Sequence, residues 1–310
     1  MLQIASRVFC CLFILNLSTS VFAKCDFSFQ DGHVYASFHN ATEGGIQQFD
    51  ENLNLIHTQT FTNIPLTTGI AFSSRDTFFF SGRDDTLDSV HLYEMNTAGS
   101  IVNSINLQSG TQLSGSNLMV GRNGEIYVGT AEGLVIVDSD FTSFEMFDFA
   151  FDGLATDLAM SDAGSLYITD TLGSRLEVFD ADRNHVDSLF IGATPVGLDF
   201  DRNDVLHSLL ANSGQLVSVD PINEIFTPVL TGLDIPIDVS FANGGNTYIS
   251  NQGGQQLLAY DENFSLIGTH TVDGRAWTLS VYNAVPEPNS VIVIALIGMG
   301  LLARTKRKHC

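Results

Sequence analysis

The sequence predicts an all-β protein: a six-bladed β-propeller of four-stranded blades, with a separate segment at each end of the chain. Three observations lead to this fold. One strand–turn–strand phrase recurs along the body, its copies lie about 42 residues apart, and no part of the body shows a sustained helical period. A repeat of this length, rich in Phe, Val, Ile and Tyr between polar turns, is typical of propeller blades.

Each copy of the phrase has an apolar strand, a polar turn with Gly or Asn, and a second strand centred on an aromatic residue. The copies are GIAFSSRDTFFFSG from Gly69, NLMVGRNGEIYVGT from Asn117, DLAMSDAGSLYITD from Asp157, GLDFDRNDVLHSLL from Gly197 and DVSFANGGNTYISN from Asp238, with a degenerate copy, FSFQDGHVYAS, from Phe27. A third strand follows each copy and ends in an acidic residue: Asp50, Glu94, Asp138, Asp180, Asp220 and Asp261. These residues are 44, 44, 42, 40 and 41 positions apart, and a fourth apolar strand follows each.

Closing six blades into a ring buries both faces of each sheet and leaves few exposed edges. One blade then needs a strand from the far end of the chain. Trp277 to Val281 matches an innermost strand with no continuation, and Cys25 to Phe29 competes for the same place. The sequence leaves this choice open. A pair of β-sandwiches is the alternative architecture, although sandwiches do not need such a regular repeat.

The copy TDLAMSDAGSLYITDTLGSRLEVFDADRN from Thr156 resembles an NHL repeat. That pattern has a Gly-Ile-Ala-Val-like strand, an Asp-Gly-Asn-like turn, a Tyr-Val-Ala-Asp-like strand and a Val-Phe-Asp-like strand. The resemblance extends from about residue 27 to 281 and is good in three units. In the fifth unit Leu206 replaces the aromatic residue, and Leu209 and Leu210 replace the polar strand end. The resemblance implies a six-bladed propeller and no particular reaction, because this fold serves enzymes, receptors and scaffolds.

Residues 1–23 are typical of a secretory signal peptide. Arg7 is their only charge, the apolar run Val8 to Leu17 follows it, and Val21-Phe22-Ala23 fits the site that a signal peptidase reads. The alternative is a first transmembrane helix, but the run is shorter than the roughly 20 residues that a span needs. Cleavage would leave Lys24 as the first residue of a propeller domain at 24–283.

Residues 284–310 form a tripartite tail that resembles the PEP-CTERM sorting signal of Gram-negative bacteria. The motif Val285-Pro286-Glu287-Pro288 precedes an apolar run from Val291 to Ala303. A basic cluster of Arg304, Lys306, Arg307 and Lys308 then ends the run. The resemblance implies export across the inner membrane, transient anchoring there, and removal of the tail near the motif by an exosortase. The protein would then reach the cell surface or the exopolysaccharide matrix. A permanent tail anchor is the alternative, although the apolar run is short for a stable span.

Charge and cysteine content agree with export. The whole chain has a formal charge of −22, and the five basic residues at its ends leave eight basic against 35 acidic residues between Lys24 and Pro288, a net charge of −27. Such a body cannot neutralise phosphates, which excludes nucleic acid as a main partner. Cys10 and Cys11 leave with the signal peptide and Cys310 with the tail, so that Cys25 has no partner for an internal disulfide.

One repeat position predicts a candidate site. Residues at equivalent points of the innermost strands could converge on the channel axis: Gly69, Asn117, Asp157, Gly197, Asp238 and Thr278. The oxygen donors of Asn117, Asp157 and Asp238 suit Ca²⁺ or Mg²⁺, in a site resembling that of gluconolactonase-type propellers. No Glu occupies this ring, unlike in that family. The competing interpretation is that these side chains bond nearby backbone N–H groups.

Other sites have weaker support. The seven histidines of the body, His33, His39, His57, His91, His185, His207 and His270, show no metal-ligand spacing and no HExxH motif. The glycine pairs at 44–45, 244–245 and 253–254 do not precede a helix, so they predict hairpin turns rather than a phosphate-binding loop. The acidic run Asp84, Asp85 and Asp88 could bind Ca²⁺ weakly, or simply form a solvated loop.

Two functions follow from these patterns. We expect a non-catalytic exported propeller, processed by signal peptidase and exosortase, that binds an extracellular polymer or protein. The alternative is a metal-dependent hydrolase or lactonase resembling the gluconolactonase-type propellers.

Overall fold

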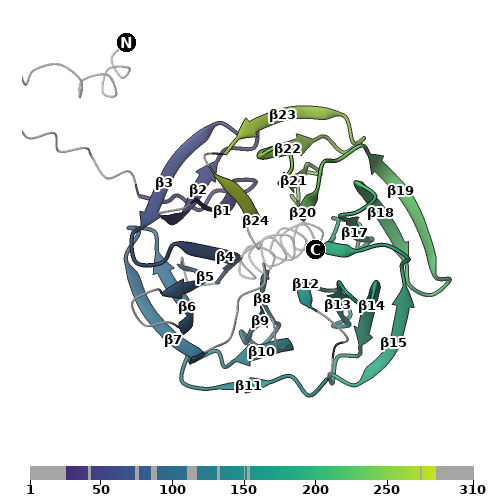
Figure 1. Cartoon of the computed structure of the whole chain (residues 1–310), viewed down its shortest axis with the longest axis horizontal. Coiled ribbons are helices and arrows are strands. Elements are labelled where there is room, and N and C mark those ends of the chain that lie inside the picture. Colours follow the sequence, from purple (N-terminus) through teal and green to yellow (C-terminus); the bar gives the residue numbers. More distant parts are fainter. Residues whose placement is uncertain are drawn as a thin grey trace, which may run out of the picture.

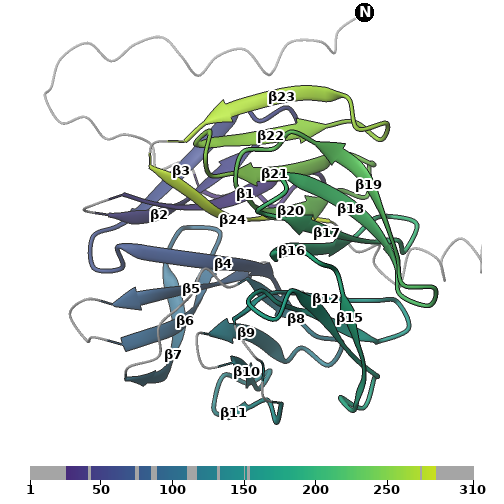
Figure 2. The same ribbon diagram turned by 45° about the vertical axis from the view of Figure 1, so that its right-hand side comes forward.

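The computed structural model describes residues 26–40, 43–73, 77–84, 89–109, 117–130, 133–149, 151, 154–272 and 274–283. These residues form six four-stranded antiparallel sheets arranged around a central axis (Figures 1 and 2). Blade 1 contains β24 (Arg275–Val281), β1 (Val34–His39), β2 (Gly44–Phe49) and β3 (Leu55–Phe61); blade 2 contains β4 (Leu66–Phe72), β5 (Thr77–Asp84), β6 (Ser89–Asn96) and β7 (Ile101–Ser109); blade 3 contains β8 (Leu118–Val120), β9 (Ile126–Thr130), β10 (Gly133–Val137) and β11 (Phe144–Met146).

The other three blades follow in chain order. Blade 4 contains β12 (Ala155–Met160), β13 (Leu166–Asp170), β14 (Arg175–Phe179) and β15 (His185–Phe190); blade 5 contains β16 (Pro195–Phe200), β17 (Leu206–Leu210), β18 (Gln215–Asp220) and β19 (Ile225–Thr231); blade 6 contains β20 (Pro236–Phe241), β21 (Thr247–Asn251), β22 (Gln256–Tyr260) and β23 (Leu266–Thr271). The predicted six-bladed architecture is confirmed.

The last strand of the body closes the ring. Strand β24 pairs antiparallel with β1, with Val34 opposite Val281 and Ala36 opposite Leu279. Arg275–Val281 therefore takes the innermost place for which the sequence left two candidates. Residues 26–30 form no strand, so that the degenerate copy at Phe27 lacks its first strand; Phe27 instead packs against Tyr35 and Phe78.

The recurring acidic residue after the third strand has a local structural role. Asp180 Oδ1 accepts backbone N–H bonds from Asp182 at 2.9 Å and from Asn184 at 2.8 Å, which fixes the turn into β15. Asp50, Asp138, Asp220 and Asp261 hold equivalent turns. In blade 2 the sequence prediction was wrong, because Glu94 lies inside β6 and Asn96 caps the turn through its bond from Ser100 N.

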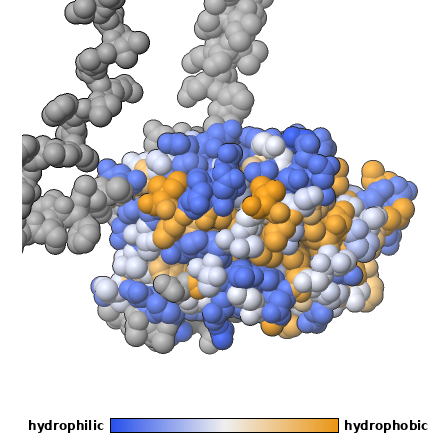
Figure 3. Space-filling model, turned by 90° about the horizontal axis from the view of Figure 1, so that it is seen from above, coloured by the Kyte–Doolittle hydropathy of each residue, from blue (hydrophilic) through white to orange (hydrophobic). Residues whose placement is uncertain are grey.

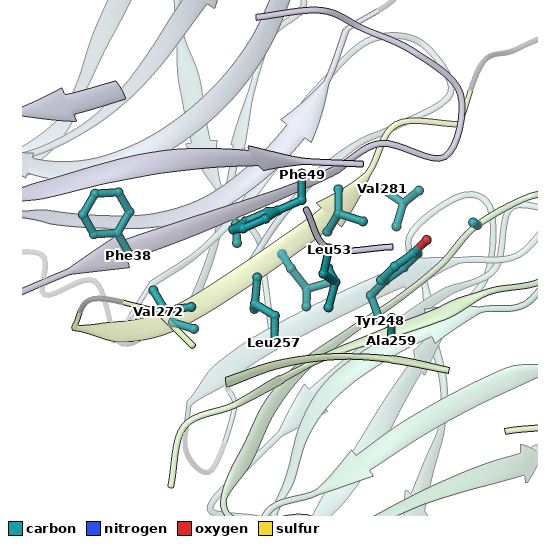
Figure 4. Packing of buried hydrophobic residues seen from close by; sticks show 13 residues of the cluster. Phe38, Phe49, Leu53, Tyr248, Leu257, Ala259, Val272 and Val281 are labelled. Atoms are coloured by element: carbon teal, nitrogen blue, oxygen red, sulfur yellow. The ribbon is translucent and has the colours of Figure 1, made fainter. Parts of the chain in front are cut away.

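Three residues after several of these aspartates, a non-glycine residue adopts positive φ. Leu53 has φ 61°, yet its side chain is only 3% exposed. The Leu53 side chain, from the turn between β2 and β3 of blade 1, packs in a cluster with Tyr248 and Leu257 of blade 6 (Figure 4). Burial of this side chain offsets the cost of the left-handed backbone. The turn thereby connects neighbouring blades.

The outer strands are less buried than the inner ones. β2 is buried along its length, whereas Leu55 and Ile56 of β3 are 48% and 41% exposed. Seen from the side, the disc shows apolar patches among polar ones (Figure 3). The core therefore lies between the blades, where the inner strands of one sheet meet those of the next.

Candidate functional site

Bulges in the innermost strands set the geometry of the channel. The register between β12 and β13 shifts between Ala155 and Leu158, and the pairs around Gly197 and Asp238 shift in the same way. A bulge takes backbone groups out of the ladder. In blade 4 a hydroxyl replaces the lost partner, because Thr169 Oγ1 accepts the Asp157 N–H at 2.8 Å. The predicted ring residues Asp157 and Asp238 therefore lie within irregular backbone, a few residues inside their strands.

The two buried aspartates connect neighbouring blades. Asp157 Oδ1 accepts the N–H of Leu158 at 2.8 Å, and its Oδ2 accepts the N–H of Leu198 in blade 5 at 2.5 Å. Asp238 repeats the pattern: its oxygens accept the N–H of Val239 in its own strand and of Leu279 in blade 1, both at 2.8 Å. Each carboxylate thus joins two blades through backbone groups, which agrees with the competing interpretation of these residues.

Asn117 reaches the same place from the other side of the ring. Its Nδ2 donates to both oxygens of Asp238, at 3.2 and 3.1 Å. Blades 3 and 6 stand opposite each other in the ring, so this bond crosses the channel (Figure 1). The structure therefore brings Asn117 and Asp238 together. Asp157 lies close enough for its charge state to depend on Asp238.

A third carboxylate, Asp199, was missed in the sequence. It lies two residues after Gly197, on the same side of the strand. Asp199 Oδ1 accepts the Phe200 N–H at 2.8 Å, and Oδ2 accepts the N–H of Phe241 in blade 6 at 2.9 Å. Side chains two residues apart lie on the same side of a strand. Inspecting the residue two positions after each predicted ring residue would therefore have identified Asp199.

Burial shifts the acidity of all three groups. Burial of the Asp157 carboxyl, followed by the charge of Asp238, raises its pKa well above the usual range. Burial likewise raises the pKa of Asp238, against the effect of the N–H bonds from Leu279 and Val239. The pKa of Asp199 rises to about 7, again because burial disfavours the charged form. The effect between the two is one-sided: the charge of Asp238 raises the pKa of Asp157, whereas a side-chain hydrogen bond with Asp157 lowers the pKa of Asp238.

A cavity of about 490 Å³ opens at one end of the channel, and Asn117 and Asp199 are among the residues that line it. Asp199, Ser240 and Ser280 line it from blades 5, 6 and 1, whereas the equivalent residues of blades 2, 3 and 4 are Ala71, Met119 and Ala159. Asn117 and Arg122 also line it, but Asp157 and Asp238 do not. Among the described lining residues there is no histidine. At this one repeat position the lining is therefore polar in blades 5, 6 and 1 and apolar in blades 2, 3 and 4.

The oxygens that could bind a cation already accept hydrogen bonds. Asn117 turns its NH₂ group to Asp238, and its Oδ1 accepts the Leu118 N–H at 3.0 Å. In the part of the chain that the structure describes, no three His, Cys, Asp or Glu side chains are grouped as metal ligands. Ca²⁺ or Mg²⁺ at Asn117, Asp157 and Asp238 stays a prediction, and binding would have to replace these bonds.

Several predicted features lie outside the described residues. They are the signal peptide, Asp85 and Asp88, the motif Val285-Pro286-Glu287-Pro288, and the basic residues Arg304, Lys306, Arg307 and Lys308. The described residues contain no helix that is long and apolar enough to cross a membrane.

The fold is similar to several solved structures. A protein of unknown function from Bacteroides caccae has 13% identity and a TM-score of 0.63, covering 81% of this chain and 98% of that one. A chain from a nidogen/laminin complex has 15% identity and a TM-score of 0.65, covering 82% and 100%. A catalytically inactive variant of virginiamycin B lyase from Staphylococcus aureus has 12% identity and a TM-score of 0.55, covering 80% and 87%.

These likenesses show a shared fold at low sequence identity. No protein-family model matches the chain. No curated protein matches it either.

Proposed function

We propose that this chain is an exported, non-catalytic β-propeller that binds an extracellular polymer or protein partner. The observation that carries the proposal is the bonding of the channel carboxylates. Asp157, Asp199 and Asp238 each accept backbone N–H bonds from their own strand and from the next blade. A carboxylate committed in this way stabilises the ring and is poorly placed to act as a general base or a metal ligand.

The terminal segments support export. Residues 1–23 carry the signal-peptide pattern, and residues 284–310 carry the motif, apolar run and basic cluster of a sorting tail. In this proposal an exosortase removes the tail near Pro286-Glu287-Pro288, and the propeller passes to the cell surface or matrix. The similar chain from the nidogen/laminin complex is an example of this fold in an assembly of proteins.

Peptide mapping of the mature protein from its native host tests the export step. We expect C-terminal peptides that end near Pro288 and none that contain His309 and Cys310. In the triple variant Pro286→Ala, Glu287→Ala, Pro288→Ala, the intact tail should remain and the protein should stay with the membrane. An intact tail on mature wild-type protein at the surface would contradict the sorting signal.

The binding step has its own test. The purified body should co-sediment with exopolysaccharide from its own host, and excess soluble polysaccharide should compete. If the polysaccharide leaves the body in solution, the polymer is excluded and a protein partner remains as the expected ligand.

A metal-dependent hydrolase is the second candidate, favoured by one observation. Buried carboxyls with raised pKa beside a cavity are frequent at active sites. In that case tightly bound Ca²⁺ or Mg²⁺ should accompany the purified protein, and lactone hydrolysis should depend on it. Asp157→Asn with Asp238→Asn should abolish both, whereas the exposed Asp187→Asn should change neither. Protein that is free of metal and inactive on lactones would exclude this candidate.

A further inference from the structure

The chain leaves the propeller body at a fixed point beside the cavity. Asn283 lines the cavity; its Oδ1 accepts the Asn243 N–H at 2.8 Å, and its Nδ2 donates to the Phe241 carbonyl at 2.9 Å. The Tyr282 N–H donates to the His33 carbonyl at 2.9 Å, and the Gly32 N–H donates to the Tyr282 carbonyl at 2.9 Å. The last residues of the body are therefore held against blades 1 and 6, close to the channel axis.

The exit point lies on one defined face of the disc. We call this the mouth face; it carries the turns between the first and second strands of the blades, including residues 121–125 and 161–165. The opposite face carries the turns between second and third strands, including residues 171–174 and 211–214. Because strands alternate in direction, these two sets of turns stand at opposite ends of the sheets.

The tether between body and apolar run is short compared with the disc. Seven residues, 284–290, separate Asn283 from Val291, and they can span at most about 25 Å when fully extended. A compact body of about 255 residues has a radius of gyration near 18 Å, and so measures about 45 Å across. A tether that starts near the axis would be used up in reaching the rim of the mouth face. It cannot pass around the side and let the disc turn over.

We propose that the mouth face is turned toward the lipid bilayer while the tail is in the membrane. The opposite face of the disc then points away from the membrane. The inference rests on the proposed function, because it needs residues 291–303 to serve as the membrane anchor. The occupant of the space before the mouth face is then the bilayer surface. A large extracellular partner would have to bind the opposite face or the rim.

Charge keeps the mouth face from adhering to the membrane. The turns between third and fourth strands also lie at this end of the sheets, and the partly exposed Asp138, Asp180 and Asp220 are among their acidic residues. Hydrogen bonds within each turn hold the pKa of these carboxyls below the usual range, so they stay ionised at neutral pH. Anionic headgroups repel them over about 8–10 Å at physiological salt. The face should stand off the bilayer at the length of the tether.

The outward face offers a different surface. Leu172, in the turn between β13 and β14, is 69% exposed there. Asn212 and Ser213 are exposed in the equivalent turn of blade 5. These residues have no bilayer in front of them in the proposed orientation.

Cysteine labelling of the membrane-held full-length chain tests the orientation. The host is a Gram-negative bacterium without an exosortase, and the background carries Cys25→Ser and Cys310→Ser. Ala163→Cys places a thiol in an exposed turn of the mouth face, and Ser213→Cys is the matched variant on the opposite face. Spheroplasts receive either a small maleimide or a bulky PEG-maleimide, and both rates are measured again after solubilisation in detergent.

We expect the bulky reagent to label Ala163→Cys severalfold more slowly than Ser213→Cys in spheroplasts, with equal rates in detergent. The small reagent should label both at similar rates throughout. If the bulky reagent labels both positions equally in spheroplasts, the orientation is wrong although the anchor stands. If the full-length chain is found outside the membrane fraction, the anchor is wrong and the orientation falls with it.

Discussion

Two regions of the ring join their blades in different ways. Between blades 4, 5, 6 and 1 the contacts are directional: Asp157, Asp199, Asp238 and Ser240 each accept a backbone N–H from the next blade. Between blades 1 and 2 the contacts are aromatic, with Phe27, Tyr35 and Phe78 in one buried cluster. One repeat therefore supports two kinds of junction.

Local geometry explains the difference. Gly197 lets blades 5 and 6 approach closely, since an added Cβ would lie 3.1 Å from Asp238 Cα. At that separation a short carboxylate reaches the next backbone. The junction between blades 1 and 2 is filled by aromatic rings instead. Phe27 and Phe78, for example, meet edge to face with their ring centroids 5.3 Å apart. The junction of blades 5 and 6 therefore uses hydrogen bonds, and that of blades 1 and 2 uses packed rings.

Ending the chain after residue 274 should produce the largest effect, because it removes β24 from the junction of blades 6 and 1. The loss exposes the edge of β1 and removes Ala276, Leu279 and Val281 from the core. We expect no cooperative thermal unfolding by circular dichroism, whereas a chain ending after residue 283 should unfold cooperatively. Equal melting temperatures for the two chains would contradict closure by β24.

The aromatic junction should be the next most sensitive. Phe78→Ala removes a ring that is 0% exposed and contacts Phe27, Tyr35 and Phe80. A cost of about 3–5 kcal/mol in the free energy of unfolding is expected for such a truncation. Phe190→Ala, at a site 69% exposed, should change it by less than about 0.5 kcal/mol. Similar losses in urea unfolding for both variants would show that the cluster does not hold the junction.

The hydrogen-bonded junction should respond to pH. Asp157, Asp199 and Asp238 have raised pKa values in the folded state, so the folded chain keeps protons that the unfolded chain releases above about pH 4. The free energy of unfolding should therefore fall as pH rises from about 4 through the folded pKa, which for Asp199 is about 7. Urea unfolding at several pH values measures this slope.

Asp199→Asn is the matched variant for that experiment. It removes the titrating group, so its slope between pH 5 and about 8 should be shallower than that of the wild type. It should also lower the stability at pH 5, since an amide NH₂ cannot accept one of the two N–H bonds. An unchanged slope would assign the pH dependence to other groups.

The smallest effect is expected at the exposed turns, with the opposite sign in pH. Asp138 accepts bonds from Thr142 and Ser143, which lower its pKa to about 2. Its contribution should be present above about pH 4 and disappear as pH falls through 2. Asp138→Ala should lower the melting temperature slightly at pH 7, less than Phe78→Ala does. If the variant and wild type still differ at pH 1.5 as they do at pH 7, the carboxylate is not the cause.

By itself, the sequence determined the number of blades, their four strands and the turns that hold them. These features depend on period-two patterning and on contacts a few residues apart, such as Asp180 with Asn184. Such contacts form within one blade and do not depend on how the blades are arranged, so the local sequence is enough to predict them. The error at Glu94 arose because a longer blade 2 moves the turn by two residues.

Only the tertiary structure decided what meets at the channel. Asn117 and Asp238 are 121 residues apart and bond across it, and Asp199 bonds to Phe241 of blade 6, which approaches blade 5 closely at Gly197. Ring closure by Arg275–Val281 also depends on which terminal segment fits between β1 and blade 6. These contacts depend on the tilt and spacing of whole sheets. A side chain reaches only a few ångströms, and the arrangement of the blades determines which groups lie within that distance.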